Sequence, residues 1–340
     1  MENRASLNLK RFLIIASYMA VSAVPIAVGL FRPGVTGYKR AMLEDMVYGK
    51  AYRPFVQRQL VPIIVRAGVW ILPEQLEQKL EDKFFRSTLV NKFGWPKDYA
   101  AEFVLTLGVM YVSLIAFLVV LKRFLSTFLH VPKRFLHLIV LLIGIGLPVT
   151  FAGQMYIYDF TQLLFFSLGI LLLYEQKWSL FYPVYILACI NKETSILLPF
   201  LFLCWKGMEI FRKSNVLHFT VQVVIGFGIY FLISYIFRNN PGGSMEWHLE
   251  RNLKLSFSTL AWVRLSVLVV LIVLSVWSFS NASVFLRRGF LATLAPLLVL
   301  TLFFGYIDEL RDYYEALPFT LCLCLLTVGK PFDIRAKDQI

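Results

Sequence analysis

Residues 103–121, FVLTLGVMYVSLIAFLVVL, decide the fold, because they form a long apolar run with no charged side chain. A helix of about 20 apolar residues crosses the roughly 30 Å of hydrocarbon in a bilayer. Glu102 precedes the run and Lys122 follows it, so both of its ends are polar. The pattern predicts a transmembrane helix.

Similar apolar runs recur along the whole chain. The first, 12–31, follows Lys10 and Arg11 and is too long for the core of a typical signal peptide, so we expect a retained signal anchor. Eight more runs follow at 135–153, 160–174, 178–190, 195–205, 216–237, 260–279, 289–307 and 313–328. Together they predict an all-α, polytopic transmembrane helix bundle of about ten spans, with residues 1–340 as a single domain.

The composition agrees with a membrane protein. Hydrophobic residues make up 58% of the 340 residues and charged residues only 16%, whereas soluble domains carry about a quarter charged residues. The net charge of +13 would favour nucleic-acid binding in a soluble protein, but no basic stretch lies in a soluble module. Membrane lipids, rather than nucleic acid, are therefore the expected partners.

The loops predict the orientation. Cytoplasmic loops of membrane proteins are enriched in Lys and Arg. If the N-terminus is cytoplasmic, the basic clusters fall in the cytoplasmic loops and tail. They are Lys122, Arg123, Lys133, Arg134, Lys177, Lys206, Arg212, Lys213, Arg287, Arg288, Lys330, Arg335 and Lys337. We therefore expect a multi-pass protein of the plasma (inner) membrane with both termini cytoplasmic. Residues 32–102 form one large outer loop, in which 38–48 and 74–85 are predicted helices and 58–72 a predicted interfacial segment.

Two spans are unusually short. The runs 178–190 and 195–205 reach only roughly 17–20 Å as helices, so their shared apex, Asn191-Lys192-Glu193-Thr194, is expected below the outer headgroups. Charged groups at that depth cost several kcal/mol unless they are paired or face water, and short, interrupted segments are typical of binding sites. We infer a water-filled cavity that opens outward and is lined by Asp159, Lys192, Glu193, Glu309, Arg311 and Asp312.

Simpler interpretations of these residues stay open at this point. The apex 191–194 can be a hairpin at a locally thinned surface, and residues 308–312 an ordinary solvated loop. Asp159 can cap the helix that begins at Thr161, because an aspartate before a helix satisfies free backbone N–H groups.

The outer loop adds further candidates. Arg53 and Arg58 lie beside the interfacial segment and could hold a lipid phosphate, since a guanidinium group matches phosphate geometry bidentately. General attraction to anionic headgroups is the alternative. Glu44 and Asp45 could reach the same cavity or form the wet face of a helix.

No cofactor or metal is predicted. The four cysteines all lie inside apolar runs and lack the spacing of a zinc site, and the four histidines are scattered. A phosphate-cradling loop of the G-x-x-x-x-G-K-[ST] type does not occur in the sequence.

The architecture resembles the GT-C class of membrane glycosyltransferases, especially its bacterial inner-membrane members. The resemblance rests on the long outer first loop, the short outward-opening spans, and three motifs: Tyr156-x-Tyr158-Asp159, Asn191-Lys192-Glu193-Thr194 and Glu309-x-Arg311. It implies a polyprenyl-phosphate-linked sugar handled at the outer, periplasmic face. Such enzymes usually carry an acidic residue early in the first outer loop; here residues 32–38 have none, and the first acids are Glu44 and Asp45.

The resemblance implies roles for the candidate residues. A carboxylate would accept the proton of the acceptor hydroxyl, and the candidates are Asp159, Glu44, Asp45 and Glu193. The candidates for binding the lipid phosphate and the sugar are Arg53, Arg58, Lys192, Glu309, Arg311 and Asp312. A lipid or glycan transporter or flippase, a polysaccharide polymerase and a non-catalytic assembly protein are the alternative functions.

Overall fold

The computed structural model describes residues 4–31, 35, 37–95, 97–151, 153–243, 245–254 and 258–337. Arg32, Pro33, Gly34 and Thr36, which belong to the stretch where the resemblance implies an acidic residue, lie outside the described residues.

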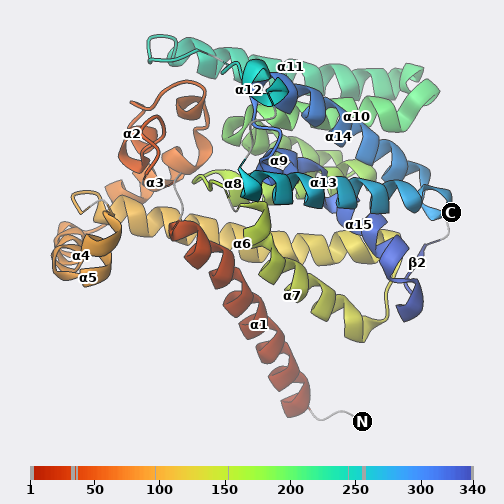
Figure 1. Ribbon diagram of the computed structural model, residues 1–340, viewed down its shortest axis with the longest axis horizontal. Helices are drawn as coiled ribbons and strands as arrows, with labels where there is room; N and C mark the ends of the chain where they lie inside the picture. Colours follow the sequence, from red (N-terminus) through yellow and green to blue (C-terminus); the bar gives the residue numbers. More distant parts are fainter. Residues whose placement is uncertain are drawn as a thin grey trace.

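Each predicted apolar run forms a helix, so the all-α prediction is confirmed. Most of these helices run side by side across Figure 1, and α1 and α7 cross them obliquely. They are α1 (Arg4–Leu30), α6 (Ala100–Phe128), α7 (Lys133–Thr150), α8 (Asp159–Tyr174), α9 (Trp178–Asn191), α10 (Leu197–Lys206), α11 (Lys213–Ile236), α13 (Thr259–Trp277), α14 (Val284–Phe304) and α15 (Leu317–Val328).

Six segments of the described chain are long and apolar enough to cross a membrane, judged by length and composition: 12–30, 100–128, 193–211, 213–236, 259–277 and 284–304. The protein is therefore a multi-pass membrane protein. Helices α8 and α9 are apolar but shorter than these six. The predicted total of about ten crossings, the identity of the membrane and the orientation of the termini stay predictions.

The segment between α1 and α6 forms a separate group of short helices. These are α2 (Leu43–Val47), η1 (Phe55–Gln57), α3 (Leu60–Ile71), α4 (Glu74–Arg86) and α5 (Thr88–Phe93). The helix predicted at 38–48 is shorter than expected, because a turn closed by Ala41 N–H and the Tyr38 carbonyl precedes it. At the end of α3 the side chain of Trp70 is 87% exposed, as suits an interfacial helix.

Helix α6 forms the centre of the bundle. Its Phe117, Leu121 and Phe124 side chains are fully buried, and it packs against α1, α3, α7 and α8. Helix α11 has the opposite character: it packs against α9 and α10 and leaves apolar side chains such as Phe231 exposed. In a bilayer, these exposed apolar side chains of α11 would contact lipid.

Short irregular elements connect the helices. They are η2 (Glu193–Ile196), η3 (Gly207–Phe211), α12 (Leu249–Leu253), η4 (Phe279–Asn281), η5 (Leu310–Ala316) and η6 (Lys330–Phe332). The strands β1 (Leu129–His130) and β2 (Arg335–Ala336) form one antiparallel pair that ties the C-terminal segment to the α6–α7 connection. Two of the 3-10 turns, η2 and η5, interrupt the helices where the polar residues gather.

Labelling from outside the membrane tests the predicted orientation. Asn239 and Asn281 lie on either side of α13 and both are exposed. If the N-terminus is cytoplasmic, a membrane-impermeant maleimide should modify Asn239→Cys and spare Asn281→Cys until the membrane is permeabilised. The unsubstituted protein, with its own four cysteines, gives the background. Labelling of Asn281→Cys in sealed cells would contradict the predicted topology.

Candidate functional site

A cavity of about 210 Å³ lies at the end of the bundle that carries the outer-loop helices. Segments far apart in the sequence line it: the stretch before α3, the loop before α8, the turn η2, the α11–α12 connection, the end of α14, and η5. Its polar and aromatic lining residues include Tyr38, Phe55, Arg58, Tyr156, Lys192, Glu193, Tyr230, Glu246, His248, Tyr306, Arg311 and Asp312.

Short helices bring the charged residues to this cavity. Helix α9 ends at Asn191, Lys192 is extended, and the 3-10 turn η2 begins at Glu193. Non-helical backbone at membrane depth is tolerated where it is buried in protein or lines a cavity. The Lys192 side chain is only 6% exposed and that of Glu193 is 34% exposed, so the apex 191–194 is partly buried in the protein, and its depth in the membrane stays a prediction.

Arg58 forms a fork-shaped ion pair with Glu193. Arg58 Nη2 lies 2.5 Å from Glu193 Oε1 and Arg58 Nε lies 3.1 Å from Glu193 Oε2. The third nitrogen donates to the hydroxyl of Tyr158, and the guanidinium lies 4.4 Å from the centroid of the Tyr158 ring. The bidentate geometry predicted for a phosphate is therefore occupied here by a carboxylate, which has a similar shape.

Lys192, the residue before Glu193, binds a different set of partners. Its Nζ lies 2.9 Å from Glu315 Oε1 and 3.0 Å from the hydroxyl oxygen of Tyr314. Thr194 donates to the same carboxylate oxygen of Glu315. A buried ammonium group needs such partners, because its desolvation is otherwise costly.

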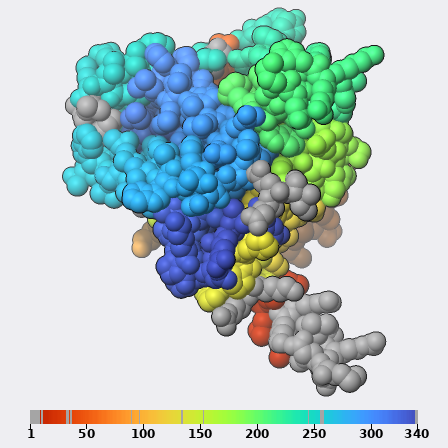
Figure 2. Space-filling view, turned by 90° about the vertical axis from the view of Figure 1, so that its right-hand side faces the viewer, coloured from red at the N-terminus to blue at the C-terminus, as the bar shows by residue number. Residues whose placement is uncertain are grey.

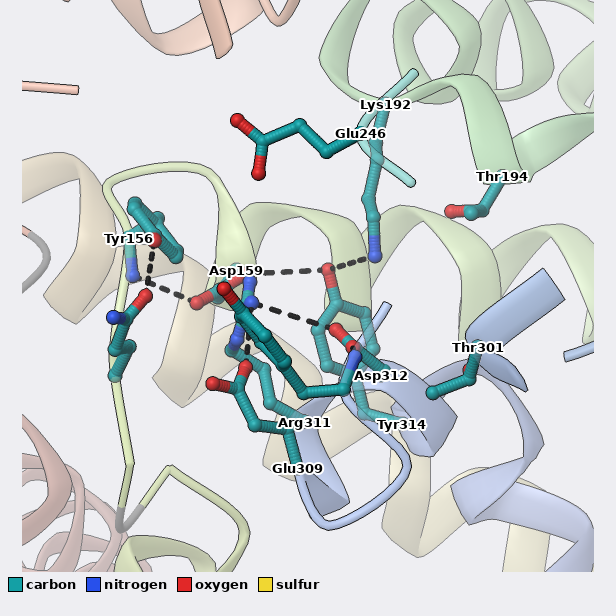
Figure 3. A network of polar contacts seen from close by, with 12 residues as sticks. Tyr156, Asp159, Lys192, Thr194, Glu246, Thr301, Glu309, Arg311, Asp312 and Tyr314 are labelled. Carbon is teal, nitrogen blue, oxygen red and sulfur yellow. Dashed lines mark hydrogen bonds and ion pairs between the residues drawn. The ribbon is translucent and has the colours of Figure 1, made fainter. Parts of the chain in front are cut away.

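Arg311 lies among three carboxylates (Figure 3). Its guanidinium nitrogens lie 3.0 Å from Glu309, 3.4 Å from Asp312 and 3.7 Å from Asp159. The Tyr314 hydroxyl links this group to Lys192, since it also donates to Asp159 at 3.3 Å. In the described part of the chain, Arg311 Nε has no hydrogen-bond partner.

The ion pairs described above form a network beside the cavity, and this network contains more carboxylates than cations. Its ion pairs join three cations, Arg58, Lys192 and Arg311, to five carboxylates, those of Asp159, Glu193, Glu309, Asp312 and Glu315. Burial raises the pKa of Glu309 above its ordinary value, although the charge of Arg311 opposes this shift. A carboxyl with a raised pKa can exchange a proton closer to neutral pH than an exposed glutamate can.

Aromatic rings form another part of the cavity wall. Tyr156 and Tyr158 stack with centroids 5.5 Å apart, and the Arg311 guanidinium lies 4.6 Å from the centroid of the Tyr156 ring. Phe55 stacks on Tyr156 from the outer-loop side, with centroids 5.3 Å apart. Tyr156 and Tyr158 are fully buried, so the rings that could pack against the apolar face of a sugar are the half-buried Tyr38 and Tyr306, which line the cavity.

The connection between α11 and α12 contributes residues that the sequence analysis did not single out for the site. Glu246 lies 2.6 Å from Arg40 and 3.3 Å from His248 Nε2, and both Glu246 and His248 line the cavity. Arg53 binds the same connection, because its guanidinium donates to the backbone carbonyls of Asn240 and Gly242. The only sequence signal for Glu246 and His248 was the predicted placement of residues 238–259 on the outer side.

The structure brings most, but not all, of the predicted site residues to the cavity. Arg58, Lys192, Glu193, Arg311 and Asp312 line it, and Glu309 and Asp159 pair with Arg311 behind the wall. Asp159 is fully buried, so it positions Arg311 and Tyr314 rather than facing the open space.

Three predicted residues lie elsewhere. Glu44 and Asp45 are half-buried on α2 and are not among the described residues that line the cavity. Arg53 is engaged by backbone carbonyls, as described above, so its guanidinium is not free for a phosphate in this structure.

The simpler interpretations of 308–312 and Asp159 differ from what the structure shows. Asp308 is buried and lies 2.5 Å from Arg264 and 3.1 Å from Arg251, so this loop is held by ion pairs rather than solvated. Asp159 Oδ2 accepts from the N–H of Tyr156 at 2.7 Å. That N–H belongs to the preceding loop, so this bond closes the loop and does not cap α8.

Among the described residues, no group of three or more His, Cys, Asp or Glu side chains is placed to hold a metal ion. No family model matches the chain, and neither a curated protein sequence nor a solved structure matches it.

Proposed function

We propose that this protein is a membrane glycosyltransferase of the GT-C type, which binds a polyprenyl-phosphate-linked sugar in the cavity. The observation that carries the proposal is the convergence of three cations, several carboxylates and aromatic rings on one cavity at the end of a membrane helix bundle. A lipid-linked sugar offers a phosphate to the cations, hydroxyl groups to the carboxylates, and a ring face to the tyrosines.

The reaction assigned to this site is a displacement at the anomeric carbon. The acceptor oxygen forms a bond to that carbon, the bond from the carbon to the phosphate oxygen breaks, and the polyprenyl phosphate leaves. Glu193 or Asp312, which line the cavity, would accept the acceptor proton. Arg311, or Arg58 once the phosphate takes the place of Glu193 in its fork, would neutralise the charge that develops on the leaving phosphate.

A proton-coupled transporter of a lipid or glycan is the second candidate. The excess of carboxylates around Arg311 and the raised pKa of Glu309 favour it. Ionisable groups that pair inside a membrane protein commonly lie on proton or substrate pathways.

Transfer of labelled sugar from a polyprenyl-phosphate donor, by purified protein in lipid nanodiscs, tests the proposal. Arg58→Lys keeps the charge but loses the fork, so it should lower transfer by about 100-fold, comparable to the loss of one donor to a transition-state charge. Arg53→Lys is the matched control, because Arg53 binds backbone carbonyls instead of lining the cavity. It should retain transfer within a few-fold.

Two other results would point away from a glycosyltransferase. A donor that crosses the membrane of proteoliposomes unchanged, in a way that depends on Arg58, would support the transporter. If the donor neither binds nor turns over with the unsubstituted protein, the glycosyltransferase proposal fails.

A further inference from the structure

A second cavity lies at the end of the molecule that carries the C-terminal segment, on the α6–α7 connection. It has a volume of about 440 Å³ and is lined by Lys122, Ser126, Leu129, His130, Val131, Leu136, His137 and Lys337. The β1–β2 pairing holds the C-terminal segment against this connection. Figure 2 looks onto this end of the molecule, where the dark blue C-terminal segment lies beside the yellow α6 and α7.

The part of the lining that the structure describes is basic. Two lysines and two histidines line the cavity, and none of its described lining residues is acidic. Two carboxylates near these segments pair with other basic residues: Glu175 pairs with Arg123, the residue after Lys122, and with Lys177, and Asp333 pairs with Arg335. A cavity with this charge favours an anion.

Contacts with other segments hold two of the basic groups in position. The backbone N–H of Lys337 donates to the Phe128 carbonyl at 2.9 Å, and its Nζ lies 2.5 Å from the Ser126 carbonyl oxygen. His137 Nδ1 lies 3.3 Å from the Tyr18 hydroxyl, which joins α7 to α1. The basic residues therefore come from three segments that the fold brings together.

An exposed apolar stripe begins next to this cavity. Leu138, Leu142, Ile145 and Val149 are all exposed on α7, and their spacing of three or four residues places them on one face. The stripe starts at the residue after His137, so a ligand with its anionic group in the cavity could lay an acyl chain along α7.

We propose that this cavity binds the phosphate of an anionic phospholipid, in the leaflet at the end of the bundle where the C-terminal segment lies. The phosphate pairs with Lys122 and Lys337, and the acyl chain follows the α7 stripe. This site is separate from the cavity of the proposed glycosyltransferase and does not depend on that function.

Lipid binding to the purified full-length protein tests the proposal. Native mass spectrometry, or the thermal shift on adding lipid, should show phosphatidylglycerol bound more tightly than phosphatidylcholine. Lys122→Gln with Lys337→Gln should weaken phosphatidylglycerol binding by about tenfold or more, since each basic residue near an anionic lipid adds to the electrostatic attraction. Lys213→Gln with Lys330→Gln removes the same charge from residues that do not line the cavity and should bind like the unsubstituted protein.

Two further measurements separate lipid binding from a detached C-terminal segment and from binding of a soluble phosphate. Lys122→Gln with His130→Gln leaves the Lys337 contacts in place, so weaker binding in this variant cannot come from a detached C-terminal segment. Equal phosphatidylglycerol binding by this variant, the Lys122/Lys337 variant and the unsubstituted protein would overturn the proposal. Glycerol 3-phosphate or inorganic phosphate that displaces the lipid at similar concentration would assign the site to a soluble phosphate and overturn the lipid assignment.

Discussion

Replacing Lys192 by Met is expected to lower the free energy of unfolding by about 3–5 kcal/mol, the usual cost of removing one partner of a buried ion pair. Lys192 is 6% exposed and its partner Glu315 is fully buried. Without Lys192, the Glu315 carboxylate keeps only the Thr194 hydroxyl as a donor among the contacts described here. Thermal unfolding of the purified protein, monitored by size-exclusion chromatography after heating, measures the loss of stability.

Two further variants test whether the loss of stability comes from the buried pair of Lys192 and Glu315. Lys254→Met removes an exposed ion pair with Glu250 and should cost less than about 1 kcal/mol. Lys192→Met with Glu315→Met replaces both charges by apolar groups and should recover much of the lost stability, because a buried pair and an apolar pair are often of similar stability. A double variant as unstable as Lys192→Met would show that the two side chains do not act as a pair.

Arg311→Gln is the second change with a large expected effect, because it leaves Asp159, Glu309 and Asp312 without their shared cation. We expect a stability loss of about 3–5 kcal/mol at neutral pH and loss of any activity at the cavity. Arg40→Gln, which removes an exposed partner of Glu246, is the matched control and should change stability by less than about 1 kcal/mol.

The pH dependence of Arg311→Gln follows from the sign of the pKa shift. Burial already raises the pKa of Glu309 with Arg311 present, and removing the positive charge raises it further. A carboxyl whose folded pKa lies above its unfolded value favours the folded state most at low pH, and that contribution is lost as pH rises through the folded pKa. The melting temperature of Arg311→Gln should therefore rise on acidification relative to the unsubstituted protein. An unchanged difference from pH 5 to pH 8 would contradict the assignment of Arg311 as the shared cation.

The apolar runs were sufficient to predict the helices, because length and hydropathy are local properties of the sequence. The short runs at 178–190 and 195–205 predicted an apex deep in the membrane, and that depth stays a prediction; the structure shows that the Lys192 side chain at this apex is buried in the protein. The partners of its charges were harder to infer. Glu315 lies 123 residues after Lys192, and nothing local to either residue indicates that they meet.

Contacts between distant segments explain the predictions that differ from the structure. Arg53 and Arg58 were equivalent in sequence, yet one meets the backbone of the α11–α12 connection and the other meets Glu193. Glu246 and His248 belong to a polar connection whose place over the cavity depends on contacts such as His248 N–H with the Phe303 carbonyl. Such long-range contacts have no periodic signal in a single sequence.

The long separations within the ion-pair network bear on how the chain is made. Synthesis proceeds from the N-terminus, so Lys192 leaves the ribosome 123 residues before Glu315, and Arg58 precedes Glu193 by 135 residues. Until Glu315 is made, Lys192 at the α9–η2 apex lacks the counter-ion that it has in the finished protein, whereas Arg58 is already present when Glu193 is made. The hairpin of α9 and α10 is therefore expected to stay beside the translocation channel, in contact with water or a membrane chaperone, until η5 emerges and supplies Glu315.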